Sequence, residues 1–238
     1  MKKSIAIING SPSNSGRMMD LDALIERIAR RYPSRWTQGY IRGKIRNDPA
    51  YQITLEALQG SPLPVLDIGC GMGFLSFYLR EFGFTPPILG LDCDEAKIIS
   101  AQGTAEEHYT NLEFRVQDAA SLHDFRGNVV ILDVLQYLTF EQQTALLQQI
   151  ATLIPPGGQC LIRGTPRDAS WRFQLTQWMD KLAYKIRWMK SNTVHYLSVE
   201  ETTAPFLAAN FSCEVRPLWA KTPFNSYLFV FKNQANLT

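Results

Sequence analysis

The stretch Val65-Leu66-Asp67-Ile68-Gly69-Cys70-Gly71-Met72-Gly73 is a short apolar run that breaks into three glycines at alternate positions. Its first residues are aliphatic and follow Pro62 and Pro64, which is typical of a buried parallel strand. The glycines let the backbone turn tightly and come close to a ligand that a side chain would block. Residues 74–80 then carry apolar side chains at helical spacing. The stretch therefore predicts a strand, a glycine loop and a helix that close on a ligand.

Three further apolar runs also end in an acidic residue, at Asp92, Asp118 and Asp133. Ligands of open α/β sheets collect at the carboxyl ends of the strands, so these acids are expected at one edge. A carboxylate in the position of Asp92 can accept hydrogen bonds from the ribose hydroxyls of an adenosine group. Dehydrogenases share that acid. The pattern thus predicts adenosine binding and leaves the cofactor open.

The G-x-G-x-G spacing, with Asp67 two residues ahead of the first glycine, resembles motif I of the class I S-adenosylmethionine-dependent methyltransferases. The run 129–138 resembles motif IV of those that act on small molecules, and the resemblance covers roughly residues 60–165. It implies a Rossmann-like α/β sandwich. The expected sheet has seven mostly parallel strands with a final antiparallel one, and a helical lid precedes it.

The resemblance implies that S-adenosylmethionine is the cofactor. Asp118 would accept from the adenine amine beside the backbone amide of Ala119, and Arg42 would bind the methionine carboxylate or simply be solvated. Cys70 is expected to fill space in the loop. The residues implied to contact the cofactor are Asp67, Gly69, Cys70, Gly71, Gly73, Asp92, Cys93, Asp118, Ala119, Asp133, Val134 and Arg42.

Candidates on the acceptor side are fewer, because the methyl group of a sulfonium is already electrophilic and a dedicated catalytic residue is optional. His195 is the best candidate for a general base, and Tyr137 is the second candidate catalytic residue. The alternative interpretation of His195 is a structural histidine. The four cysteines, Cys70, Cys93, Cys160 and Cys213, show no metal-ligand spacing, so no metal site is predicted.

The chain of 238 residues, 45% of them hydrophobic, is long enough for one domain with additions. Residues 1–17 include a segment that resembles the phosphate loop of flavodoxin-like flavin reductases, and they are interpreted as an extension, a cloning remnant or a flexible arm. Residues 18–60 are predicted as the lid, with helices over 20–32 and 48–59. Residues 35–46 are too rich in glycine to predict a helix. Residues 61–238 are predicted as the cofactor-binding domain.

The net charge of +2 favours neither nucleic acid nor another class of partner. Locally, residues 27–46 are basic, and a predicted helix over 170–190 joins cations to tryptophans, a combination that suits an anionic lipid surface, an acyl carrier protein or RNA. The alternative is that the tryptophans pack inward and the cations are solvated. Methylation of nucleic-acid amines is disfavoured, because Asp133-Val134-Leu135-Gln136 lacks the N/D-P-P-Y pattern.

These observations predict an enzyme that methylates a small molecule, with an acyl or polyketide-like chain as the finer hypothesis for the acceptor. Two alternatives stay open: an oxidoreductase that binds NAD, and a partner subunit that binds S-adenosylmethionine without transferring its methyl group. With no stretch long enough to span a membrane and no signal peptide, a cytoplasmic location is expected. The oligomeric state is not predicted.

Overall fold

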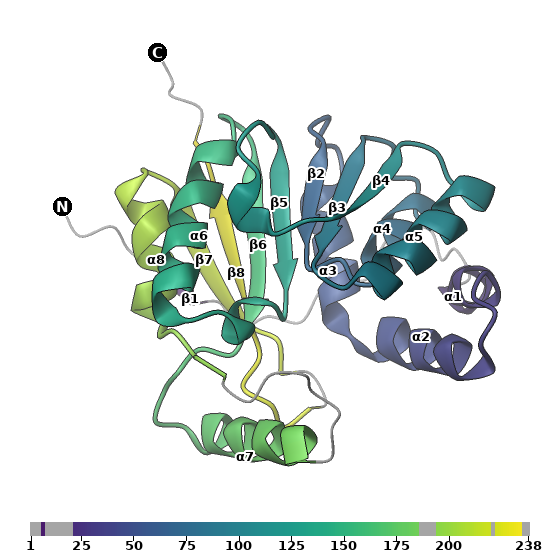
Figure 1. Cartoon of the computed structure of the whole chain (residues 1–238). Coiled ribbons are helices and arrows are strands. Elements are labelled where there is room, and N and C mark those ends of the chain that lie inside the picture. The colour runs from purple at the N-terminus through teal and green to yellow at the C-terminus, as the bar shows by residue number, and fades with distance from the viewer. Residues whose placement is uncertain (1–5, 8–20, 186–193, 220–221, 235–238) are drawn as a thin grey trace. The chain divides into compact units, whose positions relative to one another are not determined.

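The predicted alternation of strands and helices is present in the computed structural model of the chain (Figure 1). The structure describes residues 6–7, 21–185, 194–219 and 222–234, with the backbone alone for residues 6–7 and 181–185. The chain divides into two compact units. One comprises residues 10–121, and the other comprises residues 122–238 together with residues 1–9.

The unit of residues 10–121 contains a parallel sheet of β2 (Val65–Ile68), β3 (Ile88–Asp92) and β4 (Leu112–Val116), with β3 in the middle. Helices α4 (Phe74–Glu81) and α5 (Glu95–His108) connect consecutive strands. Every residue of β2 is buried, as predicted for a parallel strand, and this includes its one polar residue, Asp67. The three strand ends therefore lie along one edge, where the acids were expected.

Three helices precede this sheet: α1 (Leu21–Arg30), α2 (Arg35–Asn47) and α3 (Pro49–Leu58). Helix α1 packs against α2 and α4, and α3 also packs against α4. The predicted helix start at residue 48 is confirmed, because the Asp48 side chain accepts from the Ala50 N–H and Pro49 occupies the first helical position.

Helix α2 forms although Gly39 and Gly43 argue against it in the sequence, at a cost of about 1 kcal/mol each relative to alanine. The Ser34 side chain caps its first turn, and Ile41 and Ile45 are buried one turn apart. Tertiary contacts thus outweigh the low helical propensity, and a helix is present where the sequence did not predict one, over residues 35–47.

The other unit contains β5 (Asn128–Leu132), β6 (Gln159–Gly164), β7 (Ser212–Pro217) and β8 (Tyr227–Lys232). Strands β5 and β6 pair in parallel, whereas β8 lies between β6 and β7 and is antiparallel to both. The short strand β1 (Ala6–Ile7) pairs in parallel with β7. The predicted final antiparallel strand is therefore confirmed, and it is β8.

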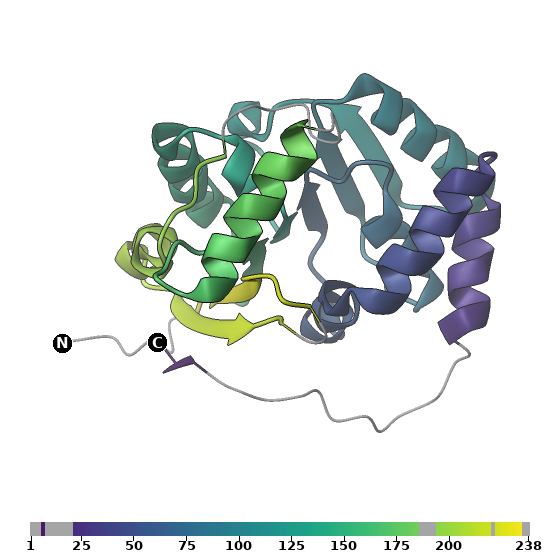
Figure 2. The same ribbon diagram turned by 90° about the horizontal axis from the view of Figure 1, so that it is seen from below.

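Helices α6 (Phe140–Leu153) and α8 (Val199–Ala208) pack against each other, and α8 also packs against β7. Both begin with a capping box, built on Thr139 and on Ser198. Helix α7 (Trp171–Lys185) stands apart from the sheet of its unit in the first view (Figure 1), and it crosses in front of that sheet when seen from below (Figure 2). Residues 186–190 of the predicted 170–190 helix lie outside the described residues.

Seven strands of four or more residues, β2–β8, are present in the described part of the chain, and the Rossmann-like methyltransferase fold predicted from the sequence is confirmed. The boundaries proposed for the extension and the lid stay predictions. Among the described helices, none combines the length and the apolar character needed to cross a membrane.

Candidate functional site

The glycine loop that follows β2 is shaped by its own backbone. Gly69, Gly71 and Gly73 all have positive φ angles, of 73°, 57° and 82°, which glycine adopts without steric cost. The N–H groups of Gly69 and Cys70 both donate to the Leu91 carbonyl at the end of β3, at 2.7 and 3.0 Å. The loop is thus fastened to the neighbouring strand rather than left to its own flexibility.

Asp92, the last residue of β3, fastens the same loop through its side chain. One carboxylate oxygen accepts from the Gly71 N–H at 2.9 Å and the other accepts from the Asp94 N–H at 2.8 Å. A carboxylate oxygen can accept more than one hydrogen bond, so these contacts leave acceptor capacity for ribose hydroxyls. Asp92 therefore has the position and the chemistry that its sequence pattern predicts.

The loop has open space beside Gly71 but not beside Gly73. A Cβ atom added at Gly71 would meet only the Lys97 Cδ, at 3.9 Å. A Cβ at Gly73 would come within 2.9 Å of ring carbons of Phe114 and Phe77. The loop thus packs on aromatic rings at Gly73 and has open space at Gly71. This arrangement suits a ligand that approaches the backbone closely.

Phe114 and Tyr32 support the loop, and sequence reasoning missed both. The Phe114 ring and the Cys70 Sγ also fill the space beside Gly90, where a Cβ would lie 2.6 and 2.9 Å from them. The Tyr32 hydroxyl, just after α1, donates to the Met72 carbonyl at 2.6 Å. Neither residue could be predicted from a local sequence pattern, because each lies about 40 positions from the loop in the sequence.

Asp67 lies inside the protein rather than at the surface of the loop, and only 3% of it is exposed. Burial raises the pKa of its carboxyl to about 7; the Ser76 hydroxyl opposes this shift and the Asp92 charge adds to it. Ser76 lies on α4 and its hydroxyl is 3.5 Å from the Asp67 carboxylate. Asp67 thus connects the end of β2 to α4, and its contact with a cofactor stays a prediction.

The two cysteines of the predicted site differ in exposure. Cys70 is buried, and burial raises the pKa of its thiol well above the usual value. Cys93 is exposed, and the pKa of its thiol is also raised, first by partial burial and then by the charges of Asp118 and Asp92. Both thiols are therefore protonated at neutral pH. The described residues contain no cluster of three or more metal-ligating side chains.

The third strand end presents Asp118 and Ala119, which precede or begin a short 3-10 turn, η1 (Ala119–Ser121). One Asp118 carboxylate oxygen accepts from the Ala120 N–H at 2.9 Å, and the residue is exposed. The Gln117 N–H donates to the Asp92 carbonyl at 3.2 Å, which aligns this strand end with that of β3. An exposed carboxylate and the backbone of the buried Ala119 are thus adjacent, as the adenine contact requires.

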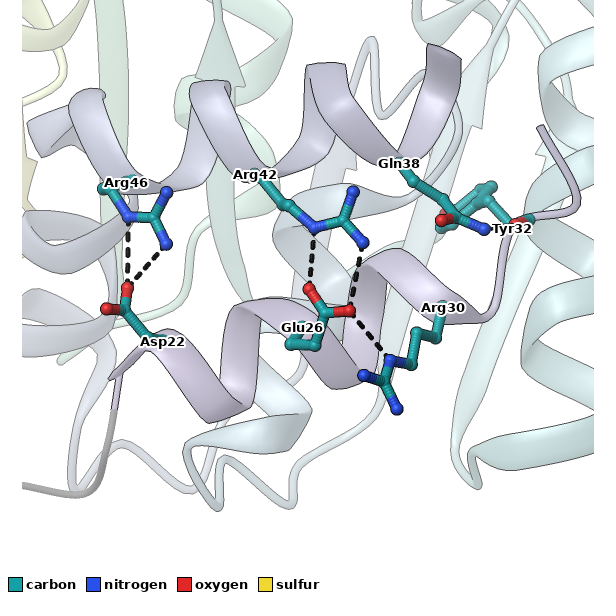
Figure 3. A network of polar contacts seen from close by, with 7 residues as sticks. All are labelled: Asp22, Glu26, Arg30, Tyr32, Gln38, Arg42 and Arg46. Atoms are coloured by element: carbon teal, nitrogen blue, oxygen red, sulfur yellow. Dashed lines mark hydrogen bonds and ion pairs between the residues drawn. The ribbon is translucent and has the colours of Figure 1, made fainter. Parts of the chain in front are cut away.

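Arg42 binds a carboxylate of the protein itself (Figure 3). Its guanidinium donates two hydrogen bonds to Glu26 on α1, at 2.7 and 3.0 Å. Arg42, followed by Arg30, holds the pKa of Glu26 at about 2. Arg46 makes a parallel pair with Asp22, so two ion pairs one turn apart join α1 to α2. A contact of Arg42 with the methionine carboxylate stays a prediction.

In the other unit, Asp133 follows β5 with a φ angle of +60°, which is uncommon for a residue other than glycine. Its carboxylate lies 3.3 Å from an Arg163 guanidinium nitrogen at the end of β6, and Arg163 also donates to the Ser226 hydroxyl at 3.1 Å. Val134 and the exposed Tyr137 follow, the latter in the 3-10 turn η2 (Leu135–Tyr137). Such strained backbone is frequent at functional sites.

His195 is held mainly by its backbone. Its N–H donates to the Gln136 carbonyl at 2.9 Å, and its carbonyl accepts from the Gln143 side chain at 3.0 Å. The imidazole meets the Phe140 ring edge-to-face, with 5.0 Å between centroids. The residue lines a small hollow together with Gln136, Gln143, Thr165 and Phe229. His195 is thereby brought close to η2, the turn that contains Tyr137.

Comparison with known proteins gives one family and several relatives. A family model described as "Methyltransferase domain" matches residues 60–203. A ribosomal protein L11 methyltransferase from Prochlorococcus marinus is 31% identical over 58% of this chain and 47% of its own length. A magnesium-protoporphyrin O-methyltransferase from Synechocystis is 36% identical over 38% of this chain and 40% of its own. The chain thus spans less than half the length of these curated relatives.

A solved structure resembles a larger share of the chain. The crystal structure of magnesium protoporphyrin IX methyltransferase from Synechocystis, with bound SAH, aligns with a TM-score of 0.64 and 21% identity. The alignment covers 87% of this chain and 93% of the other. At this identity the likeness concerns the fold.

Proposed function

Since the chain belongs to the class I S-adenosylmethionine-dependent methyltransferases, we propose that it transfers the methyl group of S-adenosylmethionine to an oxygen atom of a small-molecule acceptor. The observation that carries the proposal is the loop at residues 69–73. It is fastened by Asp92 and open above Gly71, as a ligand bound against backbone requires. Family membership excludes the NAD-dependent oxidoreductase that the sequence left open.

The residues of the unit 10–121 would hold the cofactor. Asp92 would accept from the ribose hydroxyls, and Asp118 with the Ala119 N–H would hold the adenine edge. Backbone N–H groups at the start of α4 would face the polar end of the ligand near Gly71 and Gly73. These assignments agree with the exposure of Asp118 and with the open space at Gly71.

When bound, S-adenosylmethionine supplies an electrophilic methyl group, so the protein's work is alignment and the exclusion of water. On the acceptor side we propose His195 as the group that takes the proton of an acceptor hydroxyl, with Tyr137 orienting the acceptor. The backbone contacts of His195 with Gln136 and Gln143 support this role, because they position the residue without engaging the imidazole.

Oxygen is the proposed acceptor atom because relatives named as O-methyltransferases align with this chain. One is the enzyme from Synechocystis, and another is a ubiquinone biosynthesis O-methyltransferase from Coxiella burnetii, 31% identical over 45% of this chain. Both are named for small-molecule chemistry. The acyl or polyketide-like acceptor is the finer part of the proposal, and the cytoplasmic location stays a prediction.

The experiment is a calorimetric titration of the full chain with S-adenosylmethionine, S-adenosylhomocysteine and NAD, followed by a methyl-transfer screen. The acceptor panel contains hydroxylated aromatics, free carboxylic acids, and acyl chains with and without a carrier. We expect binding of the first two ligands and transfer to an oxygen. Binding of NAD alone would contradict the family-level assignment. Cofactor binding without transfer to any acceptor would contradict the enzyme and favour the partner subunit.

A further inference from the structure

Helix α7 has two faces of different character. Phe173 and Thr176 are buried, each 6% exposed, and face the rest of their unit. Trp171 and Trp178 are 61% and 59% exposed, and they lie two helical turns apart, which places both on one face. Leu175, halfway between them in sequence, shares that face. The hypothesis that these tryptophans pack inward is therefore wrong.

The outward direction of the tryptophans is fixed by contacts on the opposite side of the helix. The Phe173 ring packs edge-to-face on Tyr196, with 5.3 Å between centroids. The Thr176 hydroxyl accepts from the Asn225 N–H at 2.9 Å, and the Tyr196 hydroxyl donates to the Asp180 carboxylate. Turning the tryptophans inward would break all three contacts, so the exposed aromatic face is built into the fold.

Further aromatic groups lie next to this face. The Arg172 guanidinium lies between the Trp171 and Trp219 rings, 4.8 and 4.6 Å from their centroids. It also donates to the Thr222 carbonyl at 2.9 Å and so holds the segment after residue 221 against α7. Phe224 in that segment is exposed as well. The helix and this segment together present an unusual amount of aromatic surface.

The charge of α7 is positive. Its sequence contains Arg172, Lys181 and Lys185 and a single acid, Asp180. Asp180 is on the anchored side and accepts from the Tyr196 hydroxyl, so the single acid of α7 is already engaged inside the unit. A helix with tryptophans on one face and an excess of cations in its sequence has the features of helices that lie in a membrane interface.

We propose that the outward face of α7, defined by Trp171, Leu175 and Trp178, binds an anionic membrane surface and holds the protein there peripherally. Indole rings favour the boundary between headgroups and acyl chains, where an apolar body and a polar N–H are both accommodated. An acidic carrier protein fits less well, because it would need cations at fixed positions to pair with its carboxylates, and Arg172 is already engaged with two indoles and a carbonyl. A membrane surface needs only the aromatic face and the overall positive charge of the helix.

The test is co-sedimentation of the full chain with vesicles of phosphatidylcholine alone and of phosphatidylcholine mixed with phosphatidylglycerol, at low and high salt. Indole emission should shift to shorter wavelength on binding. We expect binding to the anionic vesicles, weakened by salt, and a loss of about tenfold or more in the double variant Trp171→Ala/Trp178→Ala. Both side chains are exposed, so the variant should keep the wild-type melting temperature.

Trp36→Ala is the matched control, because Trp36 is 65% exposed on α2 in the other unit. It should bind vesicles as the wild type does. The proposal is overturned if no vesicle binds the protein, if the double variant binds as well as the wild type, or if RNA or an acidic carrier binds the same face while vesicles do not. A raised KM for the acceptor with unchanged vesicle binding would also overturn it and assign the face to the acceptor.

Discussion

The two units of the chain hold their predicted site residues by different means. In the unit 10–121, backbone groups hold the site: the Gly71 and Asp94 N–H groups bind Asp92, and the Leu91 carbonyl binds the loop. In the unit 122–238, side chains from distant segments hold it, as Arg163 holds Asp133 and Gln143 holds the segment of His195. The loop has a recognisable sequence of glycines and an acid at fixed spacing, whereas the contact between Asp133 and Arg163 has no comparable signal.

The largest effect on the unit 10–121 is expected at Asp67. Its pKa in the folded state, about 7, lies above the ordinary value of 3.8. Its favourable contribution to folding is thus complete below about pH 4 and is lost as the pH rises to about 7, by at most about 4 kcal/mol. In Asp67→Asn this loss disappears. Chemical denaturation of both proteins across this pH range measures it, and parallel stability profiles would contradict it.

Gly73→Ala should destabilise the protein by about 3 kcal/mol, because it combines a left-handed backbone with overpacking. The added Cβ would lie 2.9 Å from the Phe114 and Phe77 rings. Thermal or urea unfolding measures the change. The double variant Gly73→Ala/Phe114→Leu should recover part of the loss, and no recovery would show that the rings are not the obstacle.

Gly71→Val should weaken S-adenosylmethionine binding by about 100-fold, since the branched side chain fills the open space above the loop. Gly83→Val is the matched control: Gly83 has a φ angle of +82° and nothing within 4 Å of its added Cβ. Both variants carry similar backbone strain, so similar melting temperatures are expected. Calorimetry should separate them, and equal affinity in the two would remove the loop from the cofactor site.

How much of this site the sequence could predict follows the same division. Asp92 and Gly71 were predicted because a strand end, a tight turn and an acid occupy fixed spacings in one short segment. Phe114 and Tyr32 could not be, since they reach the loop from another strand and another helix. Local sequence can also mislead, as the glycines of α2 show.

Helix α2 was missed because its glycines, which disfavour a helix, lie within the segment, whereas the ion pairs that stabilise it come from α1. Asp22 and Glu26 are four residues apart on α1, and their partners Arg46 and Arg42 are four residues apart on α2. This matched spacing of opposite charges was visible in the sequence and would have favoured two adjacent helices. The fold of each unit could therefore be predicted well, and the direction of individual side chains, such as Trp171 on α7, could not.

Asp92→Asn should weaken S-adenosylmethionine binding by about tenfold, because the amide keeps one acceptor oxygen and loses the charge. Asp94→Asn makes the same change two residues away. Asp94 caps α5 by accepting from the Lys97 N–H, so its substitution should lower stability slightly and leave affinity unchanged. A larger loss of affinity at Asp94 than at Asp92 would contradict the ribose assignment.

The smallest effect on cofactor affinity is expected at His195, in the unit 122–238. His195→Gln should change the affinity for S-adenosylmethionine by less than about twofold. It should lower kcat for a hydroxyl acceptor by about 100-fold, the usual contribution of a general base. The backbone bonds to Gln136 and Gln143 do not depend on the imidazole, so the segment should keep its place.

His123→Gln serves as the control, because His123 is an exposed histidine in the same unit. A fall in kcat of only a few-fold, equal in both variants, would make His195 a structural residue and leave proton removal to the solvent. A fall in cofactor affinity as large as that of Asp92→Asn would instead assign His195 to cofactor binding.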